Sequence, residues 1–385
     1  MIYLDNAATS YPKPSNVYNA LCRNVKTLGG NPSRGGHILS QKSSDEVFEC
    51  RNTIANFFDA NPENVVFTLN ATHALNTAIK GVAEPGDHFV ISNLEHNAVF
   101  RPIVSVCENI DCEFDVANVL RGNKYEIVAE IGRLIKPNTK AVIMTHASNI
   151  CSFRLPIREI GQMCRRKNVA FIVDASQSAG HVEISVEKDY INILCAPAHK
   201  GLYGCMGLGL LISDGRYKIK TLTEGGSGYN SADIHMPDSM PEHLEAGTLP
   251  VPAISALKSG IETINRIGLD KIATHESHLH NLLHEKLSYL SYVKQYMSEY
   301  AGPCLLFNVN GIPSTLIDDK LTERGVCIRS GFHCAPLAHK SLGTGEYGAI
   351  RCSFGIYTNE SEINTFIKVL KDVVNEIKRD KEAYV

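Results

Sequence analysis

The chain lacks the features that would assign it to nucleic-acid-binding, membrane or disulfide-stabilised proteins. Its net charge is only −3, from 38 basic and 41 acidic residues among 385, so no broad attraction to nucleic acid or to an anionic membrane is expected. No uncharged apolar run reaches the length that spans a bilayer. The N-terminus carries Asp5 and Asn6 where a signal peptide needs an apolar stretch. We therefore expect a cytoplasmic protein with neither nucleic-acid nor membrane partners.

The twelve cysteines lack the spacing of a metal site. None forms a CxxC pair, and the closest two, Cys107 and Cys112, have no matching histidine or cysteine partners. A disulfide framework is not expected in a chain of this length without a secretion signal. We expect no bound metal, and we expect most of these cysteines to be buried small hydrophobic residues.

Short apolar runs alternate with helical patterns over the first two thirds of the chain. The runs have the composition of parallel strands covered on both faces: 63–69, 88–93, 140–146, 169–175 and 191–196. Helical patterns lie between them or flank them: 71–83, 123–135 and 156–168. This order predicts an α/β fold with a large, mostly parallel sheet and crossover helices.

The pattern changes after about residue 255. A long helical stretch, 254–268, leads to strand-like segments at 304–310 and 348–354. The chain then closes with an amphipathic helix whose apolar face carries Ile363, Phe366, Ile367, Leu370, Val374 and Ile377. We expect a large α/β domain over 15–255 and a small α+β domain over 256–385, with residues 1–14 packed alongside the small domain.

Lys200 lies between two apolar stretches, Tyr190–Ala196 and the glycine-rich run that ends at Leu211. Burial of a lysine is costly, but desolvation lowers its pKa and makes the amine a nucleophile that can form a Schiff base. Upstream, Asp174 ends another apolar run. A lysine for the aldehyde and a carboxylate for the pyridine nitrogen are what pyridoxal 5′-phosphate (PLP) requires.

Other polar residues follow the predicted strands, where α/β sheets place their sites. Ala71, Thr72 and His73 open a helix whose free amides suit a phosphate, although an ordinary helix cap would have the same sequence. His96 could stack on an aromatic cofactor or be a loop residue. Asn149 could donate to a ring oxygen or belong to a turn.

Together these motifs resemble the class V aminotransferase group of fold-type I PLP enzymes, and within it the cysteine desulfurase and selenocysteine lyase proteins of the second group. The resemblance runs nearly end to end. It rests on YLDNAATSYPKP, GNPSRGGHILS, DASQSAGH, AHK, HLEAGT and RSGFHCA. The combination of DASQSAGH, AHK and RSGFHCA is specific, whereas each motif alone is weak.

The resemblance implies a role for individual residues. Lys200 matches the lysine that carries PLP, Asp174 the pyridinium partner, Gln177 a residue near the ring hydroxyl and His96 the stacking histidine. Phosphate contacts are implied for Thr72, for His199 and, from the neighbouring subunit of a homodimer, for Thr248. Arg351 matches the arginine that binds the substrate carboxylate, and Asn149, Arg34 and Arg329 match other residues at the site.

Cys334 matches the persulfide-forming cysteine of the family. It lies in a glycine-rich stretch expected to be an exposed loop. Arg329 and His333 are nearby groups that could favour the thiolate through positive charge. Only 17 positions separate Cys334 from Arg351 (351 − 334), so we expect a short loop whose thiol reaches the substrate but not a distant acceptor.

The implied activity is conversion of L-cysteine to L-alanine, with Lys200 as the base and Cys334 as the nucleophile that takes the sulfur. Selenocysteine lyase, another PLP-dependent C–S lyase, and a scaffold without catalysis remain alternatives, and a sulfur-acceptor protein is an expected partner. One departure concerns Pro197, which stands where the family has a hydroxyl residue. The lost phosphate contact corresponds to about 1.5–3 kcal/mol, the strength of a charge-assisted hydrogen bond.

Overall fold

The computed structural model describes residues 1–385 except 33–34, 121, 230, 297–301 and 384–385. The chain divides into two compact units. The large unit comprises 13–147 and 155–269, and the small unit comprises 1–12, 148–154 and 270–385. The domain boundaries expected from sequence stay a prediction, because compactness alone does not show where an independently folding domain ends.

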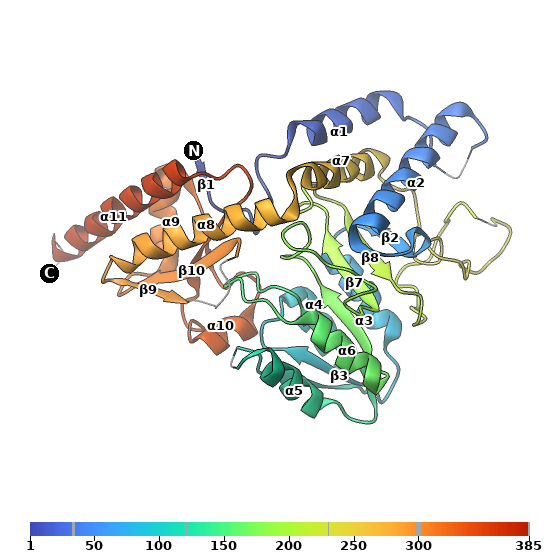
Figure 1. Ribbon diagram of the computed structural model, residues 1–385, viewed down its shortest axis with the longest axis horizontal. Coiled ribbons are helices and arrows are strands. Elements are labelled where there is room, and N and C mark those ends of the chain that lie inside the picture. The colour runs from blue at the N-terminus through green and yellow to red at the C-terminus, as the bar shows by residue number, and fades with distance from the viewer. Residues whose placement is uncertain (33–34, 121, 230, 297–301, 384–385) are drawn as a thin grey trace. The chain divides into compact units, whose positions relative to one another are not determined.

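A seven-stranded sheet forms the centre of the large unit (Figure 1). Its strands, in spatial order, are β2 (Val65–Thr68), β8 (Gly209–Ser213), β7 (Ile193–Pro197), β6 (Ala170–Asp174), β5 (Thr139–Thr145), β3 (His88–Ser92) and β4 (Glu113–Ala117). β8 pairs antiparallel with both of its neighbours, and the pairs from β7 to β4 are parallel. The prediction of a mostly parallel sheet is confirmed.

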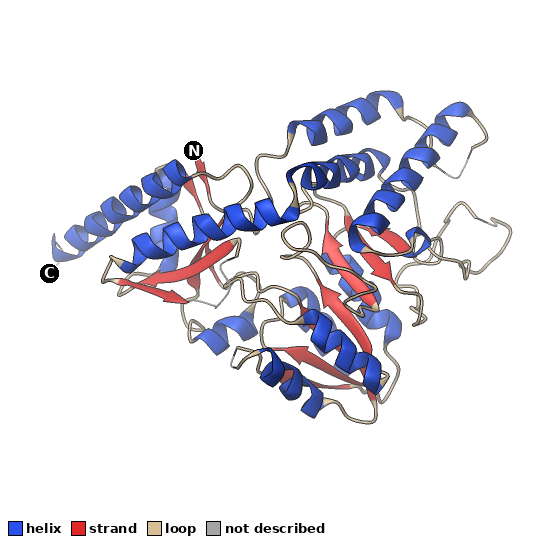
Figure 2. Ribbon diagram, viewed as in Figure 1, coloured by secondary structure: helices blue, strands red, loops and turns tan. Residues whose placement is uncertain are grey.

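Helices flank this sheet (Figure 2), and side chains cap several of them. They are α1 (Ser15–Thr27), α2 (Ile38–Phe58), η1 (Pro62–Asn64), α3 (Ala71–Val82), α4 (Asn97–Ile110), α5 (Lys124–Leu134), α6 (Ile157–Lys167) and α7 (Val251–Ile267). The Asn70 side chain accepts the His73 N–H at the start of α3, and Asn123 forms a capping box with Glu126 at the start of α5. The helical segments predicted from sequence are confirmed to within a few residues.

The small unit contains an antiparallel sheet and a two-stranded parallel pair. The sheet has the order β12 (Arg329–Gly331), β13 (Ala349–Ser353), β10 (Cys304–Val309), β9 (Val293–Tyr296), and the pair joins β1 (Ile2–Tyr3) to β11 (Val326–Cys327). Its helices are α8 (Leu269–Ser288), which starts at the unit boundary, α9 (Ser314–Glu323), α10 (Pro336–Leu342) and α11 (Glu360–Ala383).

The C-terminal helix buries the face that its sequence predicts. Ile363, Phe366, Leu370 and Val374 are fully buried in a core that also contains Leu4 and Phe307. At the start of this helix, the N–H of Asn359 donates to Glu362 Oε2 and the N–H of Glu362 donates to Asn359 Oδ1. This reciprocal pair is a capping box with asparagine as the cap.

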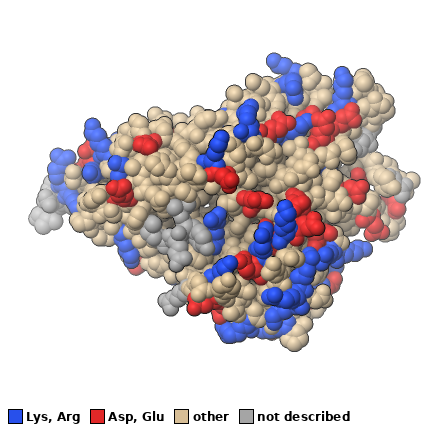
Figure 3. Space-filling view, viewed as in Figure 1, with Lys and Arg blue, Asp and Glu red and all other residues tan. Residues whose placement is uncertain are grey.

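The surface and the helices agree with the absence of membrane features in the sequence. In the ranges that the structure describes, no helix is long and apolar enough to cross a bilayer. Basic and acidic side chains are interspersed over most of the face drawn in Figure 3. Some of them pair across elements, as Lys124 does with Glu159.

Candidate active site

The carboxyl ends of β3, β5 and β6 carry several of the predicted site residues in the large unit. The chain runs outward from β3 to β4 and in the opposite direction from β5 to β6, so the strand order reverses between β3 and β5. Ligands of open α/β sheets bind at such a switch point. His96 follows β3, and Asp174 ends β6 opposite Thr145 of β5.

Glu95 links the end of β3 to the end of β5 by side-chain hydrogen bonds. Its side chain is fully buried, and Oε1 accepts the Ser92 hydroxyl at 2.5 Å and the Thr145 N–H at 2.9 Å. Within the described residues Oε2 has no hydrogen-bond partner. Burial raises the pKa of Glu95 to about 8, the bonds from Ser92 and Thr145 oppose this shift, and the Asp174 carboxylate adds to it. Glu95 is therefore a neutral acid at pH 7.

Asp174 and Lys200 lie at the ends of neighbouring strands. Asp174 pairs with Cys195 across β6 and β7, and Lys200 follows β7 by three residues. The Asp174 side chain is buried, with Oδ1 accepting the Ser176 N–H at 2.9 Å. Gln177 is buried in the turn after β6. The structure thus brings the predicted carboxylate and the predicted lysine to one edge of the sheet.

His96 caps the helix that follows β3. Its Nδ1 accepts the Ala98 N–H at 3.0 Å, and the residue is half-buried. With Nδ1 acting as the acceptor, the neutral ring carries its proton on Nε2. His96 therefore combines the structural role of a helix cap with its predicted role at the cofactor.

Backbone packing against glycines shapes the turn that presents Lys200. The Lys200 carbonyl accepts the Tyr203 N–H at 2.9 Å. A Cβ on Gly180 would lie 2.1 Å from the Gly201 carbonyl oxygen, and one on Gly260 of α7 would lie 2.2 Å from the Leu202 carbonyl oxygen. Any side chain at either glycine would displace the turn.

The N-terminus of α3 meets the ends of β7 and β8, as a phosphate site requires. A Cβ on Gly209 would lie 2.4 Å from the carbonyl carbon of Asn70, so only glycine allows this approach. Gly209 pairs with Pro197, three residues before Lys200. The His73 N–H already donates to Asn70, which leaves the amides of Ala71 and Thr72 as donors at the helix end.

A second lysine lies beside His199 in the large unit. Lys13 Nζ donates to the His199 carbonyl at 2.5 Å. Burial lowers the pKa of Lys13 to about 8. Burial, with the nearby charges of Lys200 and Lys13, lowers the pKa of His199 to about 4. His199 is therefore neutral at pH 7, so it would contact a phosphate through hydrogen bonding and not through charge.

Thr248 has an exposed side chain on a loop that is anchored by the buried Glu245. Glu245, three residues earlier, is buried, forms an ion pair with Arg51 at 2.5 Å and accepts the Phe67 N–H at 2.6 Å. The Thr248 hydroxyl accepts from Asn31 Nδ2 at 3.4 Å. Arg34, another predicted site residue, lies outside the described residues.

The small unit contains the predicted carboxylate-binding residue. Arg351, on β13, is 2% exposed; Nη2 donates to Asp5 Oδ1 at 2.7 Å and Nη1 to the Asn149 carbonyl at 2.9 Å. Among the described residues the buried Nε–H has no acceptor. Asp5 and Asn149 thus hold the guanidinium in place, and a carboxylate could accept from Nε–H and from the second N–H of Nη2. Arg329 lies opposite Arg351 in the pairing of β12 with β13, and its side chain is exposed.

Cys334 is exposed on a left-handed turn after β12. The Ala335 N–H donates to the Phe332 carbonyl at 2.9 Å, and both central residues have positive φ, His333 at 48° and Cys334 at 54°. Such turns normally use asparagine and glycine. Two non-glycine residues in this region cost about 1–3 kcal/mol each unless their surroundings hold them.

His333 does not supply the positive charge that its position in the sequence led us to expect. Its side chain is buried, and desolvation together with Arg351 lowers its pKa to about 2. The ring is neutral at pH 7 and cannot promote the Cys334 thiolate electrostatically. The expectation failed because a sequence shows that a histidine is nearby but not that its ring points into the protein.

The residues present fit PLP but show no metal site. The buried Asp174 suits a ring nitrogen, the free amides at the start of α3 suit a phosphate, and Arg351 Nε suits a carboxylate. In the described ranges no cluster of three or more metal-ligating side chains occurs.

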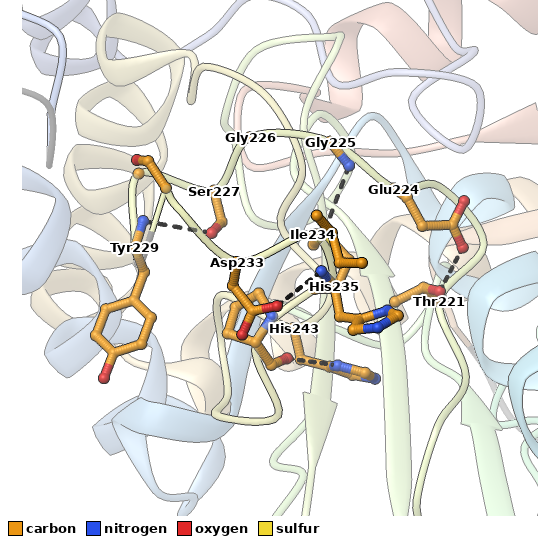
Figure 4. Close-up of a pocket in the computed structure, with 14 residues that line it drawn as sticks. Thr221, Glu224, Gly225, Gly226, Ser227, Tyr229, Asp233, Ile234, His235 and His243 are labelled. Carbon is orange, nitrogen blue, oxygen red and sulfur yellow. Dashed lines mark hydrogen bonds between the residues drawn. The ribbon is translucent and has the colours of Figure 1, made fainter.

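One hollow of the large unit does not contain the predicted site. It has a volume of about 960 Å³ and is enclosed by the loop from Thr221 to Pro237, with His243 at one side (Figure 4). Local hydrogen bonds shape this loop, including Thr221 to Glu224 and the His235 N–H to Asp233. None of the predicted catalytic side chains lines this hollow.

Glu95 and Lys13 of the large unit and His339 of the small unit lie next to predicted site residues but have no role predicted from sequence. Glu95 directly precedes His96, and an acid next to a predicted site histidine was an available signal. Lys13 lies inside the YPKP motif, where its burial was not visible. His339 pairs with His333 through side chains only, and no sequence spacing indicates that contact.

Comparison with known proteins identifies the family. The model of the family described as Aminotransferase class-V matches residues 2–366. A protein of Methanothermobacter thermautotrophicus named "Probable cysteine desulfurase" is 30% identical over 383 residues, covering 97% of this chain and 94% of that protein. A protein of the same name from Pyrococcus abyssi is 30% identical over 389 residues, covering 98% and 95%.

Solved structures agree with this result. The apo structure of cysteine desulfurase from Thermococcus onnurineus superimposes with a TM-score of 0.88 at 29% identity, covering 97% of this chain and 95% of that one. A cysteine desulfurase from Escherichia coli, at 22% identity and a TM-score of 0.86, covers 97% and 94% and supports the fold alone. The predicted resemblance is confirmed: the chain belongs to the class V aminotransferase family.

Proposed function

We propose that this protein is a PLP-dependent cysteine desulfurase that converts L-cysteine to L-alanine and receives the sulfur on Cys334. One observation carries the proposal. Asn149 links the strained turn that carries the exposed Cys334 to a buried arginine: its side chain donates to the His333 carbonyl, its own carbonyl accepts from Arg351 Nη1, and the Arg351 Nε–H is left for a carboxylate. The names of the relatives at 30% identity support the same activity.

The large unit would hold the cofactor. Lys200 would carry PLP, Asp174 would keep the ring nitrogen protonated, and Gln177 and His96 would contact the ring. Thr72, His199 and the amides of Ala71 and Thr72 would bind the phosphate. PLP, when bound, withdraws electrons from the substrate Cα and so acidifies its hydrogen and weakens the Cβ–S bond. Lys200 would remove the Cα proton.

The small unit would hold the substrate carboxylate and accept the sulfur. Arg351 would bind the carboxylate through Nε and Nη2, oriented by Asp5 and Asn149. The Cys334 thiolate would attack the substrate sulfur with a lone pair, forming an S–S bond. The Cβ–S bond would break with its electron pair moving to Cβ, which takes a proton, and Lys200 would return a proton to Cα to yield alanine. No external oxidant or reductant is needed, because the enzyme retains the sulfur as a persulfide.

The decisive test is the location of the transferred sulfur. After incubation with L-cysteine, mass spectrometry should find one added sulfur on the peptide that contains Cys334, and Cys334→Ala should abolish both persulfide and most alanine formation. Cys22→Ala, another exposed cysteine, is the matched control and should change neither. Full alanine production by Cys334→Ala would contradict the assignment. Release of free selenide or sulfite with Cys334 dispensable would identify one of the alternative lyases.

We also propose a homodimer and an external sulfur acceptor. The side chain of Thr248 is exposed, and the buried Glu245–Arg51 ion pair anchors its loop; both observations support a contact with a neighbouring subunit. The short chain between Cys334 and Arg351 includes α10, so the thiol has little reach and the acceptor must approach it. A fully active monomer in light scattering would contradict the dimer. A protein that stays colourless with added PLP would support the scaffold alternative.

A further inference from the structure

Two buried histidines support the turn that presents Cys334. The rings of His333 and His339 stack with centroids 5.3 Å apart and planes 9° apart. His333 Nδ1 lies 3.1 Å from His339 Nε2, and His339 Nδ1 lies 2.7 Å from the Thr344 hydroxyl. Burial lowers the pKa of His339 to about 4. Both rings are thus neutral at pH 7 and connect through hydrogen bonds.

The proton positions along the series of hydrogen bonds from Arg329 through His333 and His339 to Thr344 are mutually consistent. His333 Nε2 lies 3.1 Å from the Arg329 carbonyl, which can only accept, so Nε2–H of His333 is the donor there. His333 Nδ1 must then accept from His339 Nε2–H, and His339 Nδ1 must accept the Thr344 hydroxyl. Each ring nitrogen has one role and one partner, which fixes the orientation of both rings.

The same series continues from His333 to the predicted substrate site. The His333 carbonyl accepts from Asn149 Nδ2 at 2.8 Å, and the Asn149 carbonyl accepts from Arg351 Nη1 at 2.9 Å. Asn149 therefore contacts the turn with its side chain and the guanidinium with its backbone. All of these residues belong to the small unit.

We propose that His333, His339 and Asn149 are positioning residues that set the location of the Cys334 thiol relative to Arg351. The proposal rests on the proposed function, in which Arg351 holds the substrate carboxylate and Cys334 attacks its sulfur. The distance between those two substrate groups is fixed by the covalent structure of cysteine. The two protein groups must match it, and a left-handed turn of non-glycine residues keeps its geometry only when its surroundings hold it.

His339→Phe tests this link without touching the substrate or the thiol. Phenylalanine retains a ring for stacking but cannot donate to His333, so the turn loses its orienting bond. Because misplacement by about 1 Å can cost about 100-fold in rate, we expect the kcat for alanine formation from cysteine to fall by at least about tenfold. The KM for cysteine should change less than about twofold, since Asp5 and Asn149 still hold Arg351.

Two matched variants separate positioning from general loss of a buried histidine. His280 is buried on α8 of the same unit and bonds to the Gly302 carbonyl, so His280→Phe should leave kcat within about twofold. His339→Gln keeps a side-chain donor for His333 and should recover part of the lost kcat. The rate at which iodoacetamide alkylates Cys334, measured by mass spectrometry on the holoenzyme, should change in His339→Phe and not in His280→Phe.

A second substrate isolates the thiol step. Cysteine sulfinate loses its sulfur as sulfur dioxide, with the Cβ–S electron pair moving to Cβ, and needs no attacking thiol. His339→Phe should therefore lower the ratio of alanine formed from cysteine to alanine formed from cysteine sulfinate by at least about tenfold. An unchanged ratio, kcat and alkylation rate would overturn the inference while leaving the desulfurase proposal intact. If the wild type forms no alanine from cysteine, both fail.

Discussion

Lys200 and Cys334 are each presented by a turn, but different forces hold the two turns. The Lys200 turn is fixed by backbone packed on backbone, with Gly180 and Gly260 admitting no side chain. The Cys334 turn is fixed by side chains, namely the His333–His339 stack and the amide of Asn149. The former therefore depends on the sheet topology, and the latter on a few individual residues.

This difference has a functional rationale. A lysine that carries a cofactor must meet a ring whose other contacts lie on neighbouring strands, so rigid strand ends suit it. A thiol that attacks a sulfur and then passes it on must be exposed, and exposure removes the packing that would otherwise hold it. The small unit compensates with buried groups beneath an exposed cysteine.

Removing the lysine should have the largest effect and should spare the small unit. Lys200→Ala should lower alanine formation by about 10²–10⁴-fold, the contribution of a positioned base, and should abolish the borohydride-reducible adduct. Iodoacetamide should still alkylate Cys334 at the wild-type rate, because the turn does not depend on the lysine. A lysine variant that changes Cys334 reactivity would break the comparison.

Glu95 offers a test by pH. The pKa of Glu95 is raised from 4.5 to about 8 in the folded protein. Above pH 4.5 the unfolded chain therefore loses this proton, whereas the folded protein must keep it or bury a charged carboxylate. The wild type should thus lose stability as the pH rises from about 4.5 to 8, and Glu95→Gln should not. At 1.36 kcal/mol per pH unit, the difference between their unfolding free energies should change by about 3 kcal/mol between pH 5 and pH 8. Urea titrations at both pH values measure it, and parallel pH profiles would show that Glu95 is ionised in the folded protein.

Arg351→Lys should raise the KM for cysteine by about 10–100-fold, because lysine cannot reproduce a bidentate contact whose lost bond is worth about 1.5–3 kcal/mol. PLP affinity should not change, since the arginine belongs to the small unit. Arg324→Lys, in an exposed ion pair with Glu376, is the control and should leave KM unaltered. Weaker PLP binding in Arg351→Lys would contradict a division of labour between the units.

Pro197→Ser should have the smallest effect and should be confined to the cofactor. A hydroxyl at the end of β7 would add a phosphate contact beside the N-terminus of α3. We therefore expect the dissociation constant of PLP to fall by up to about tenfold, which corresponds to the lower end of the strength of a charge-assisted hydrogen bond. Pro197→Ala removes the proline ring without adding a hydroxyl, so it separates the effect of losing the ring from the effect of gaining the hydroxyl. Equal PLP dissociation constants for the serine and alanine variants would show that the hydroxyl makes no contact.

The large unit could be predicted from sequence because its signals are local. Apolar runs located β3, β5 and β6 to within two residues, and strand ends then placed His96 and Asp174 on one edge. The direction of β8 was not predictable, since an apolar run of five residues reads alike in both orientations. Residues 148–154 belong to the small unit although the residues on both sides of them belong to the large unit. No change of composition along the sequence indicates this.

The small-unit site was predictable by residue type but not by geometry. Cys334 stands out through its glycine-rich surroundings, yet nothing in RSGFHCA reveals that two consecutive non-glycine residues adopt positive φ. Nor does the spacing of His333 and His339 show that their rings stack, because the contact depends on where α10 begins. Side-chain contacts between a turn and the helix after it lie beyond periodicity and propensity.

The pairing of the first strand has a consequence for biosynthesis. Leu4 donates to the Cys327 carbonyl and accepts from the Ser353 N–H, so its partners are synthesised 323 and 349 residues after it (327 − 4 and 353 − 4). At about 5–20 residues per second, the segment around Leu4 waits roughly 16–70 s for those partners. The strands of the large sheet all precede residue 214, whereas the small unit's core, apart from Leu4, lies at Leu279 and beyond. The large unit can therefore begin to fold before most of the small unit's core has been made.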